Sequence, residues 1–245
     1  MHVLITRPEP DASTLKVQLE ALGHAVTVEP LLQIELMPIE AGAFEGVQAL
    51  VATSRNSLRA LAESPARPAA LKLPIFVVGA GTAELARALG FARVIQGAET
   101  ARDLVPIIAG EIEPALGAVA HLAGATLAFD LAAALEGEGI AVRKVIVYRA
   151  HAPQMLPLQT AQMIEEGALD AVILMSPRTA AVFAELVAAA GLKDSARRLT
   201  FLCLSQAVAQ NLQSLGAVRA EVAANPNAAE MLSLVGRVAT QPPAV

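Results

Sequence analysis

The stretch Ala49-Leu-Val-Ala-Thr-Ser-Arg-Asn-Ser57 recurs later in the chain as Asp170-Ala-Val-Ile-Leu-Met-Ser-Pro-Arg-Thr179. A second stretch, from Phe76 to Gly90, recurs between Leu202 and Gly216. Each copy is typical of a short apolar strand followed by a helix, and one copy alone is too small to cover both faces of a sheet. The repeats therefore predict two similar α/β domains.

A shorter repeat precedes each of these copies. Val3 to Pro8, followed by a helix that ends at Gly23, is similar to Val119 to Gly124 and the helix after it. Short apolar strands that alternate with helices are typical of parallel sheets with right-handed crossovers. The predicted strands are Val3–Thr6, Ala25–Glu29, Ala49–Thr53, Ile75–Val78, Val94–Ile95, Val119–Leu122, Val142–Tyr148, Ala171–Met175, Phe201–Leu204 and Ala220–Val222.

Two extended apolar segments, residues 31–38 and 145–152, interrupt this alternation. We interpret them as crossovers that together form a two-stranded connector. Residues 1–35 and 152–245 are then expected to form one discontinuous domain, and residues 38–148 the other. In this arrangement the N-terminal segment completes the C-terminal domain. A cleft between two such domains is a usual place for a small-molecule site.

Composition excludes several classes of protein. Of the 245 residues, 55 % are apolar and 17 % charged, as in a globular chain. The net charge of −5 and the aromatic content of 3 % argue against nucleic-acid binding. No uninterrupted apolar stretch reaches the roughly 18 residues of a membrane span. Because the chain enters a strand at once and Cys203 is its one cysteine, we expect a cytoplasmic protein.

The loops at the carboxyl ends of the predicted strands are the candidate site, since ligands of parallel sheets bind there. For any single loop, ordinary helix capping explains the hydroxyls. Taken together, helix N-termini with uncapped N–H groups would bind carboxylates or phosphates. The candidate binding residues are Thr6, Arg7, Thr53, Ser54, Gly79, Thr82, Ser176, Pro177 and Ser205. Arg7 has an alternative interpretation as a solvated surface charge.

Other chemistries find little support. The pair Gly79 and Gly81, with Glu99 further on, partly matches a dinucleotide fingerprint, but Glu84 replaces the third glycine. An oxidoreductase therefore remains a weak alternative. The four histidines are too scattered for a metal site, and no Ser-His-Asp set or nucleophile elbow is present. We expect neither a metal nor an organic cofactor.

From about residue 3 to residue 235, the chain resembles the uroporphyrinogen-III synthase family. The similarity lies in the order and spacing of short motifs along the chain. These motifs are Leu4-Ile-Thr-Arg-Pro-Glu-Pro10, Leu22-Gly23-His24, Pro30-Leu31-Leu32, Thr53-Ser54-x-Asn56, Val78-Gly79-x-x-Thr82-Ala83, Val147-Tyr148-Arg149 and Ser176-Pro177.

The resemblance implies a cyclising lyase of tetrapyrrole biosynthesis, including heme biosynthesis. Such an enzyme closes linear hydroxymethylbilane to uroporphyrinogen III, loses water and inverts the last pyrrole ring through a spiro intermediate. The bilane carries eight carboxylates, and the helix N-termini would bind them. Tyr148 matches the tyrosine proposed to assist loss of the hydroxyl group, and a phenol keeps its proton at neutral pH. Its alternative role is that of a packed aromatic whose hydroxyl bonds a backbone group.

We expect a monomer that receives the bilane from hydroxymethylbilane synthase. The main alternative function is a non-catalytic, two-lobed protein that binds small anions or other solutes.

Overall fold

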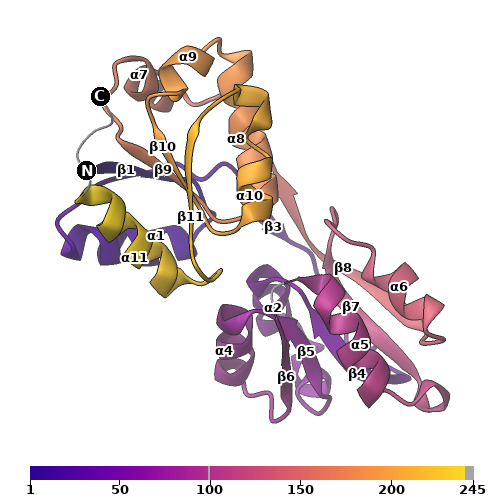
Figure 1. Ribbon diagram of the computed structural model, residues 1–245. Coiled ribbons are helices and arrows are strands. Elements are labelled where there is room, and N and C mark those ends of the chain that lie inside the picture. The colour runs from indigo at the N-terminus through magenta and orange to yellow at the C-terminus, as the bar shows by residue number, and fades with distance from the viewer. Residues whose placement is uncertain (99, 241–245) are drawn as a thin grey trace. The chain divides into compact units, whose positions relative to one another are not determined.

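The computed structural model describes residues 1–98 and 100–240, which divide into two compact units (Figure 1). Unit 1 comprises residues 1–33 and the C-terminal part of the chain from His151. Unit 2 comprises Ile34–Ala150. Glu99, the acidic residue of the partial dinucleotide fingerprint, lies outside the described residues.

Unit 1 is built on a five-stranded sheet in the order β11-β10-β9-β1-β2, and its strand pairs are parallel. Its strands are β1 (His2–Ile5), β2 (Ala25–Val28), β9 (Ala171–Leu174), β10 (Thr200–Cys203) and β11 (Arg219–Val222). Strand β1 pairs with β9, so that Val3 lies opposite Ala171. The predicted fold class is therefore confirmed, because the N-terminal strand completes the sheet of the C-terminal half.

Helices cover both faces of this sheet (Figure 1). Val3 and Ile5 pack on the face covered by α1 (Asp11–Ala21) and α11 (Ala228–Ala239), whereas Leu4 packs on the other. That second face carries α7 (Leu158–Glu165), α8 (Pro177–Ala189), α9 (Lys193–Ala196), α10 (Gln206–Gln210) and the 3-10 turn Gln213–Leu215. Alternate residues of one strand thus supply two cores.

Unit 2 has a six-stranded sheet in the order β3-β8-β7-β4-β5-β6. Its strands are β3 (Gln33–Leu36), β4 (Val47–Ala52), β5 (Ile75–Val78), β6 (Val94–Gly97), β7 (Ala118–Gly124) and β8 (Val142–His151). One face packs against α2 (Arg55–Ala62), α3 (Arg67–Ala70) and α4 (Ala80–Leu89). The other packs against α5 (Ala101–Glu111) and α6 (Leu131–Gly137), and the 3-10 turn Pro114–Leu116 precedes β7.

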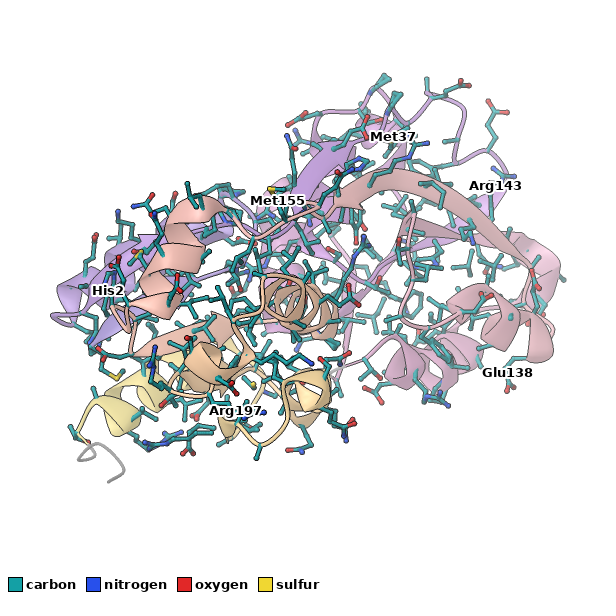
Figure 2. The ribbon with its side chains drawn as sticks, turned by 90° about the horizontal axis from the view of Figure 1, so that it is seen from above. His2, Met37, Glu138, Arg143, Met155 and Arg197 are labelled. Carbon is teal, nitrogen blue, oxygen red and sulfur yellow. The ribbon has the colours of Figure 1, made fainter. Side chains whose placement is uncertain are left out.

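The two crossover segments supply neighbouring strands, β3 and β8, and both belong to the sheet of unit 2. Strand β8 does not end at Tyr148 but continues to His151, and β3 is its neighbour. The N–H of Met37 donates to the carbonyl of Val147 at 2.8 Å. Arg143, which Figure 2 labels, also lies on β8. It donates to the carbonyl oxygens of Ala43 and Glu45 at 2.9 and 2.8 Å. Strand β8 thus lies between β7 and β3 and continues beyond the end that its own sequence indicated.

Every predicted strand is present, and the predicted bounds differ from the observed ones only at the ends. The short helices α3 and α9 were not predicted, since four residues are too few to show a helical period. Within residues 1–98 and 100–240, no helix is long and apolar enough to cross a membrane.

Candidate active site

The carboxyl edge of the unit 2 sheet gathers half of the predicted site residues. Strands β5, β4 and β7 are consecutive and parallel, so their carboxyl ends lie at one edge. Thr53 and Ser54 follow β4, Gly79 and Thr82 follow β5, and Tyr148 pairs with the last residue of β7. The structure thus brings these five residues to the same edge of one unit.

Ser54 has an ordinary capping role at the start of α2. Its hydroxyl oxygen accepts a hydrogen bond from the N–H of Asn56 at 3.2 Å. The side chain before this helix thus already bonds one of the N–H groups that were expected to be uncapped. Thr53, beside it, is half-buried.

The start of α4 is different, because its N-cap is Gly79 and no side chain caps its first turn. Gly79 has a φ of 74°, a conformation that favours glycine. The N–H groups of the first helical residues, Ala80 to Thr82, have no partners within a helix. Thr82 itself is buried, with 7 % of its surface exposed. The backbone N–H groups are therefore the better candidates for anion binding here.

Arg55 is a residue of this edge that the sequence prediction missed. Its guanidinium lies 3.3 Å from the position that a Cβ on Gly81 would occupy, so it passes over the first turn of α4. A positive side chain beside a positive helix end favours an anion at that place. Only the packing of α2 against α4 reveals this pairing, since the two residues are 26 positions apart in sequence (81 − 55).

Tyr148 packs half-buried at the end of the apolar cluster that contains Val147. In the part of the chain that the structure describes, its hydroxyl makes no hydrogen bond with the protein. The alternative role, in which the hydroxyl bonds a backbone group, therefore finds no support. A hydroxyl that is available to a ligand fits this geometry better.

In unit 1, Thr6 has a structural role. It is fully buried, and its hydroxyl donates to the carbonyl of Ile173 in the neighbouring strand at 2.8 Å. Helix α1 begins only at Asp11, so Thr6 is not at a helix start. The predicted ligand role of Thr6 is not supported, because its one donor is already used inside the sheet.

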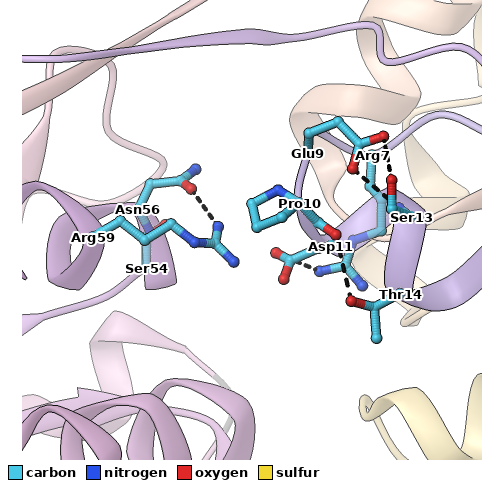
Figure 3. Close-up of polar contacts among 9 residues, drawn as sticks. All are labelled: Arg7, Glu9, Pro10, Asp11, Ser13, Thr14, Ser54, Asn56 and Arg59. Carbon is cyan, nitrogen blue, oxygen red and sulfur yellow. Dashed lines mark hydrogen bonds and ion pairs between the residues drawn. The ribbon is translucent and has the colours of Figure 1, made fainter.

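Arg7 is also held within unit 1. It forms an ion pair with Asp11 at 3.0 Å, and both side chains are mostly buried (Figure 3). The carboxylate of Glu9 accepts hydrogen bonds from the N–H and hydroxyl of Ser13, at 3.0 and 2.9 Å, which caps the first turn of α1. Arg7 is thus a positioned charge and not a loosely solvated one.

The same figure shows a polar pair on α2 of unit 2. There Arg59 donates to the side-chain oxygen of Asn56 at 2.8 Å, one turn of the helix away.

The remaining unit 1 candidates begin helices after β9 and β10. Ser176 caps α8, since its hydroxyl oxygen accepts from the N–H of Thr179 at 3.1 Å, and Pro177 is exposed at the first helical position. Ser205 precedes α10 without capping it through its side chain. At Ser176 the N–H of Thr179 is therefore already bonded, and the two serines differ in the role of their hydroxyls.

Two buried titratable groups are His121, within β7, and Cys203, the last residue of β10. The pKa of His121 is lowered to about 4, mainly by burial and also by the nearby charge of Lys144, while Asp130 opposes the shift. Burial raises the pKa of the Cys203 thiol to about 12, so this thiol is not a nucleophile near neutral pH. Among the described residues, no group of three His, Cys, Asp or Glu side chains could hold a metal ion.

Comparison with known proteins extends over nearly the whole chain. The family described as uroporphyrinogen-III synthase HemD matches residues 13–233. No curated protein sequence is significantly similar to the chain.

Two solved structures share the fold. A mutant uroporphyrinogen III synthase from the extremely thermophilic bacterium Thermus thermophilus is 19 % identical, with a TM-score of 0.68 over 99 % of this chain and 100 % of that one. The uroporphyrinogen-III synthetase of Helicobacter pylori is 18 % identical, with a TM-score of 0.65 over 97 % and 99 % of the two chains. The family match confirms the resemblance found in the motifs: the chain belongs to the uroporphyrinogen-III synthase family.

Proposed function

We propose that this protein closes hydroxymethylbilane to uroporphyrinogen III, with loss of water and inversion of the last pyrrole ring. The observation that supports the assignment most strongly is the placement of Tyr148. Its hydroxyl, which bonds no protein group among the described residues, lies at the sheet edge of α4 and Arg55. A proton donor and anion-binding groups are the two requirements of this reaction.

Anion binding follows from the start of α4. The N–H groups of Ala80 to Thr82 carry the positive end of the helix dipole, and Arg55 adds a full charge beside them. Local donors of this kind suit a substrate with many carboxylates, even though the protein has a net charge of −5. In unit 1, we assign further carboxylate contacts to Arg7, Ser176, Pro177 and Ser205.

Tyr148 assists the departure of the hydroxyl group. The carbon–oxygen bond of the hydroxymethyl group breaks, the oxygen takes the phenolic proton, and water leaves. The electron-poor carbon left behind is attacked by the last pyrrole ring, which later loses a proton to the phenolate. The overall change is the loss of one water, and the tyrosine returns to its starting state.

The choice of isomer depends on positioning. The uncatalysed reaction joins the ends of the bilane at the nearest free carbon and gives the symmetric type I product. To obtain type III, the protein must hold the last ring so that its substituted carbon, and not its free carbon, attacks the electron-poor carbon first. Carboxylates fixed at defined helix starts provide such an orientation without any cofactor.

The substrate closes spontaneously, so it has to be transferred quickly. We assign the protein to the cytoplasm, as a monomer that takes the bilane from hydroxymethylbilane synthase. Size measurement in solution by light scattering tests the monomer directly, and a dimer would contradict it.

The isomer assay tests the proposed function. Freshly generated hydroxymethylbilane is incubated with the protein, the product is oxidised, and the type I and type III porphyrins are separated. We expect mostly type III, with type I alone in the enzyme-free and heat-denatured controls. A solute-binding protein would bind the bilane without raising the type III fraction, which would refute the assignment.

A further inference from the structure

Gly124, the last residue of β7, lies directly under the ring of Tyr148. A Cβ on Gly124 would stand 2.6 Å from the ring carbon Cζ of Tyr148 and 2.8 Å from its hydroxyl oxygen. Carbon atoms that do not bond each other pack at about 3.5–4.0 Å. Any side chain at this position would therefore displace the phenol.

The backbone does not explain a glycine here. Gly124 is not among the glycines with positive φ, in contrast to Gly79 and Gly90. An alanine could therefore adopt the same backbone without strain. What an alanine could not do is leave the ring of Tyr148 in place.

An irregular pairing of β7 and β8 puts the ring over the glycine. Ala123 lies opposite Ile146, whereas the next residue, Gly124, lies opposite Tyr148. Strand β8 thus has one extra residue, Val147, and this bulge turns Tyr148 to the face where Val147 is buried. Without it, strand alternation would direct the phenol to the opposite face.

The glycine cannot move away easily, because hydrogen bonds hold the backbone on both sides of it. The hydroxyl of Ser57, on α2, donates to the carbonyl of Leu122 at 2.7 Å. The N–H of Ala125 donates to the carbonyl of Tyr148 at 3.0 Å. The contact between glycine and ring is therefore built into a fixed part of the sheet.

We propose that Gly124 is a positioning residue, whose missing side chain leaves the space that fixes the Tyr148 phenol in its reactive orientation. The inference rests on the proposed function for its effect on catalysis. The placement of the ring can be tested independently of activity.

The chain has no tryptophan and one tyrosine, so its tyrosine fluorescence reports on Tyr148 alone. In Gly124→Ala, we expect a changed emission intensity and a changed acrylamide quenching constant, because the ring has moved. The control is Gly97→Ala, at the end of β6 in the same sheet. A Cβ there would stand 2.6 Å from a side-chain carbon of Leu104, so the steric clash is equally close but does not involve Tyr148.

The activity measurement is a double-mutant cycle. We expect Gly124→Ala to lower kcat on the order of 10²-fold, similar to Tyr148→Phe, because both remove the same proton donor from its place. In the Tyr148→Phe background, Gly124→Ala should change kcat by less than about twofold, since no donor remains to be displaced. A general loss of structure would instead multiply the two effects, and Gly97→Ala would show the same fall in kcat.

Each outcome separates the proposal from its alternatives. Unchanged tyrosine fluorescence in Gly124→Ala would overturn it. A moved ring with full kcat would also overturn it, provided that Tyr148→Phe is inactive. If Tyr148→Phe is itself active, the proposed function of the tyrosine fails, whereas the fluorescence still decides whether Gly124 positions the ring. Should Gly124→Ala not fold, the double variant with Tyr148→Ala must restore folding, and failure to do so would refute the steric explanation.

Discussion

His121 should make the stability of unit 2 depend on pH, and replacing it by leucine should remove that dependence. The imidazole is 1 % exposed on β7, and neither ring nitrogen has a hydrogen-bond partner in residues 1–98 and 100–240. Its neighbour in register on β8 is Lys144, whose charge disfavours a second positive charge. Asp130 at the start of α6 opposes this effect but does not overcome burial.

The size and sign of the effect follow from the two pKa values. Burial lowers the pKa of His121 from 6.5 to about 4 in the folded protein. The unfolded chain therefore takes up the proton first as the pH falls. The contribution of neutral His121 to the free energy of unfolding is fully present above pH 6.5. It is lost as the pH falls to about 4, by about 3 kcal/mol in total at 1.36 kcal/mol per pKa unit. At neutral pH, His121→Leu should stabilise the protein by about 1–2 kcal/mol, because it removes an unbonded buried polar group.

Urea unfolding of the wild type and of His121→Leu at several values between pH 7.5 and pH 4.5 tests this. Protonation of the carboxylates affects both proteins equally, so the difference between their free energies of unfolding isolates His121. The control is Gln33→Ala, at an exposed position of β3 without a titratable group, which should follow the wild type at every pH. If His121→Leu loses as much stability on acidification as the wild type does, the reasoning is refuted.

Further changes probe other parts of the account. Tyr148→Phe should lower kcat on the order of 10²-fold with the fold intact, as followed by the isomer assay and circular dichroism; near-normal kcat would exclude a proton donor. Arg55→Gln should raise KM more than it lowers kcat, and an unchanged KM would remove Arg55 from the anion site. Thr6→Val should cost about 1 kcal/mol in urea unfolding, through the lost bond to the Ile173 carbonyl, and leave KM unchanged; a raised KM would return Thr6 to the site. Cys203, whose buried thiol has its pKa raised to about 12, should react with a thiol reagent only after unfolding, and fast labelling of the native protein would contradict its burial.

The strands and their sheets could be predicted from local patterns. Apolar runs of four to six residues followed by helix-start residues marked β4, β5, β9 and β10. The internal repeat then required β1 to pair with the C-terminal half, as it does with β9. Local patterns sufficed here because an apolar run lies within one strand, and because the internal repeat compares copies of the same strand and helix.

The details of the site could not be predicted in the same way. The hydroxyl of Thr6 was expected to bind a ligand, but it donates a hydrogen bond to the carbonyl of Ile173, 167 positions away in sequence. The bulge at Val147 is a property of two paired strands, and nothing in the sequence of β8 alone indicates it. The guanidinium of Arg55 reaches Gly81 only because two helices pack together. Each of these contacts depends on tertiary packing and leaves no periodic signal.

Inversion of the last pyrrole ring by this protein can be followed directly with a labelled substrate. Hydroxymethylbilane is prepared with ¹³C at the hydroxymethyl carbon and at the carbon of the last ring that carries the bridging methylene. Inversion joins these two carbons, so the oxidised product should show direct one-bond coupling between them in its ¹³C spectrum. Product formed at the enzymatic rate without that coupling would mean simple end-to-end closure, and it would contradict the account.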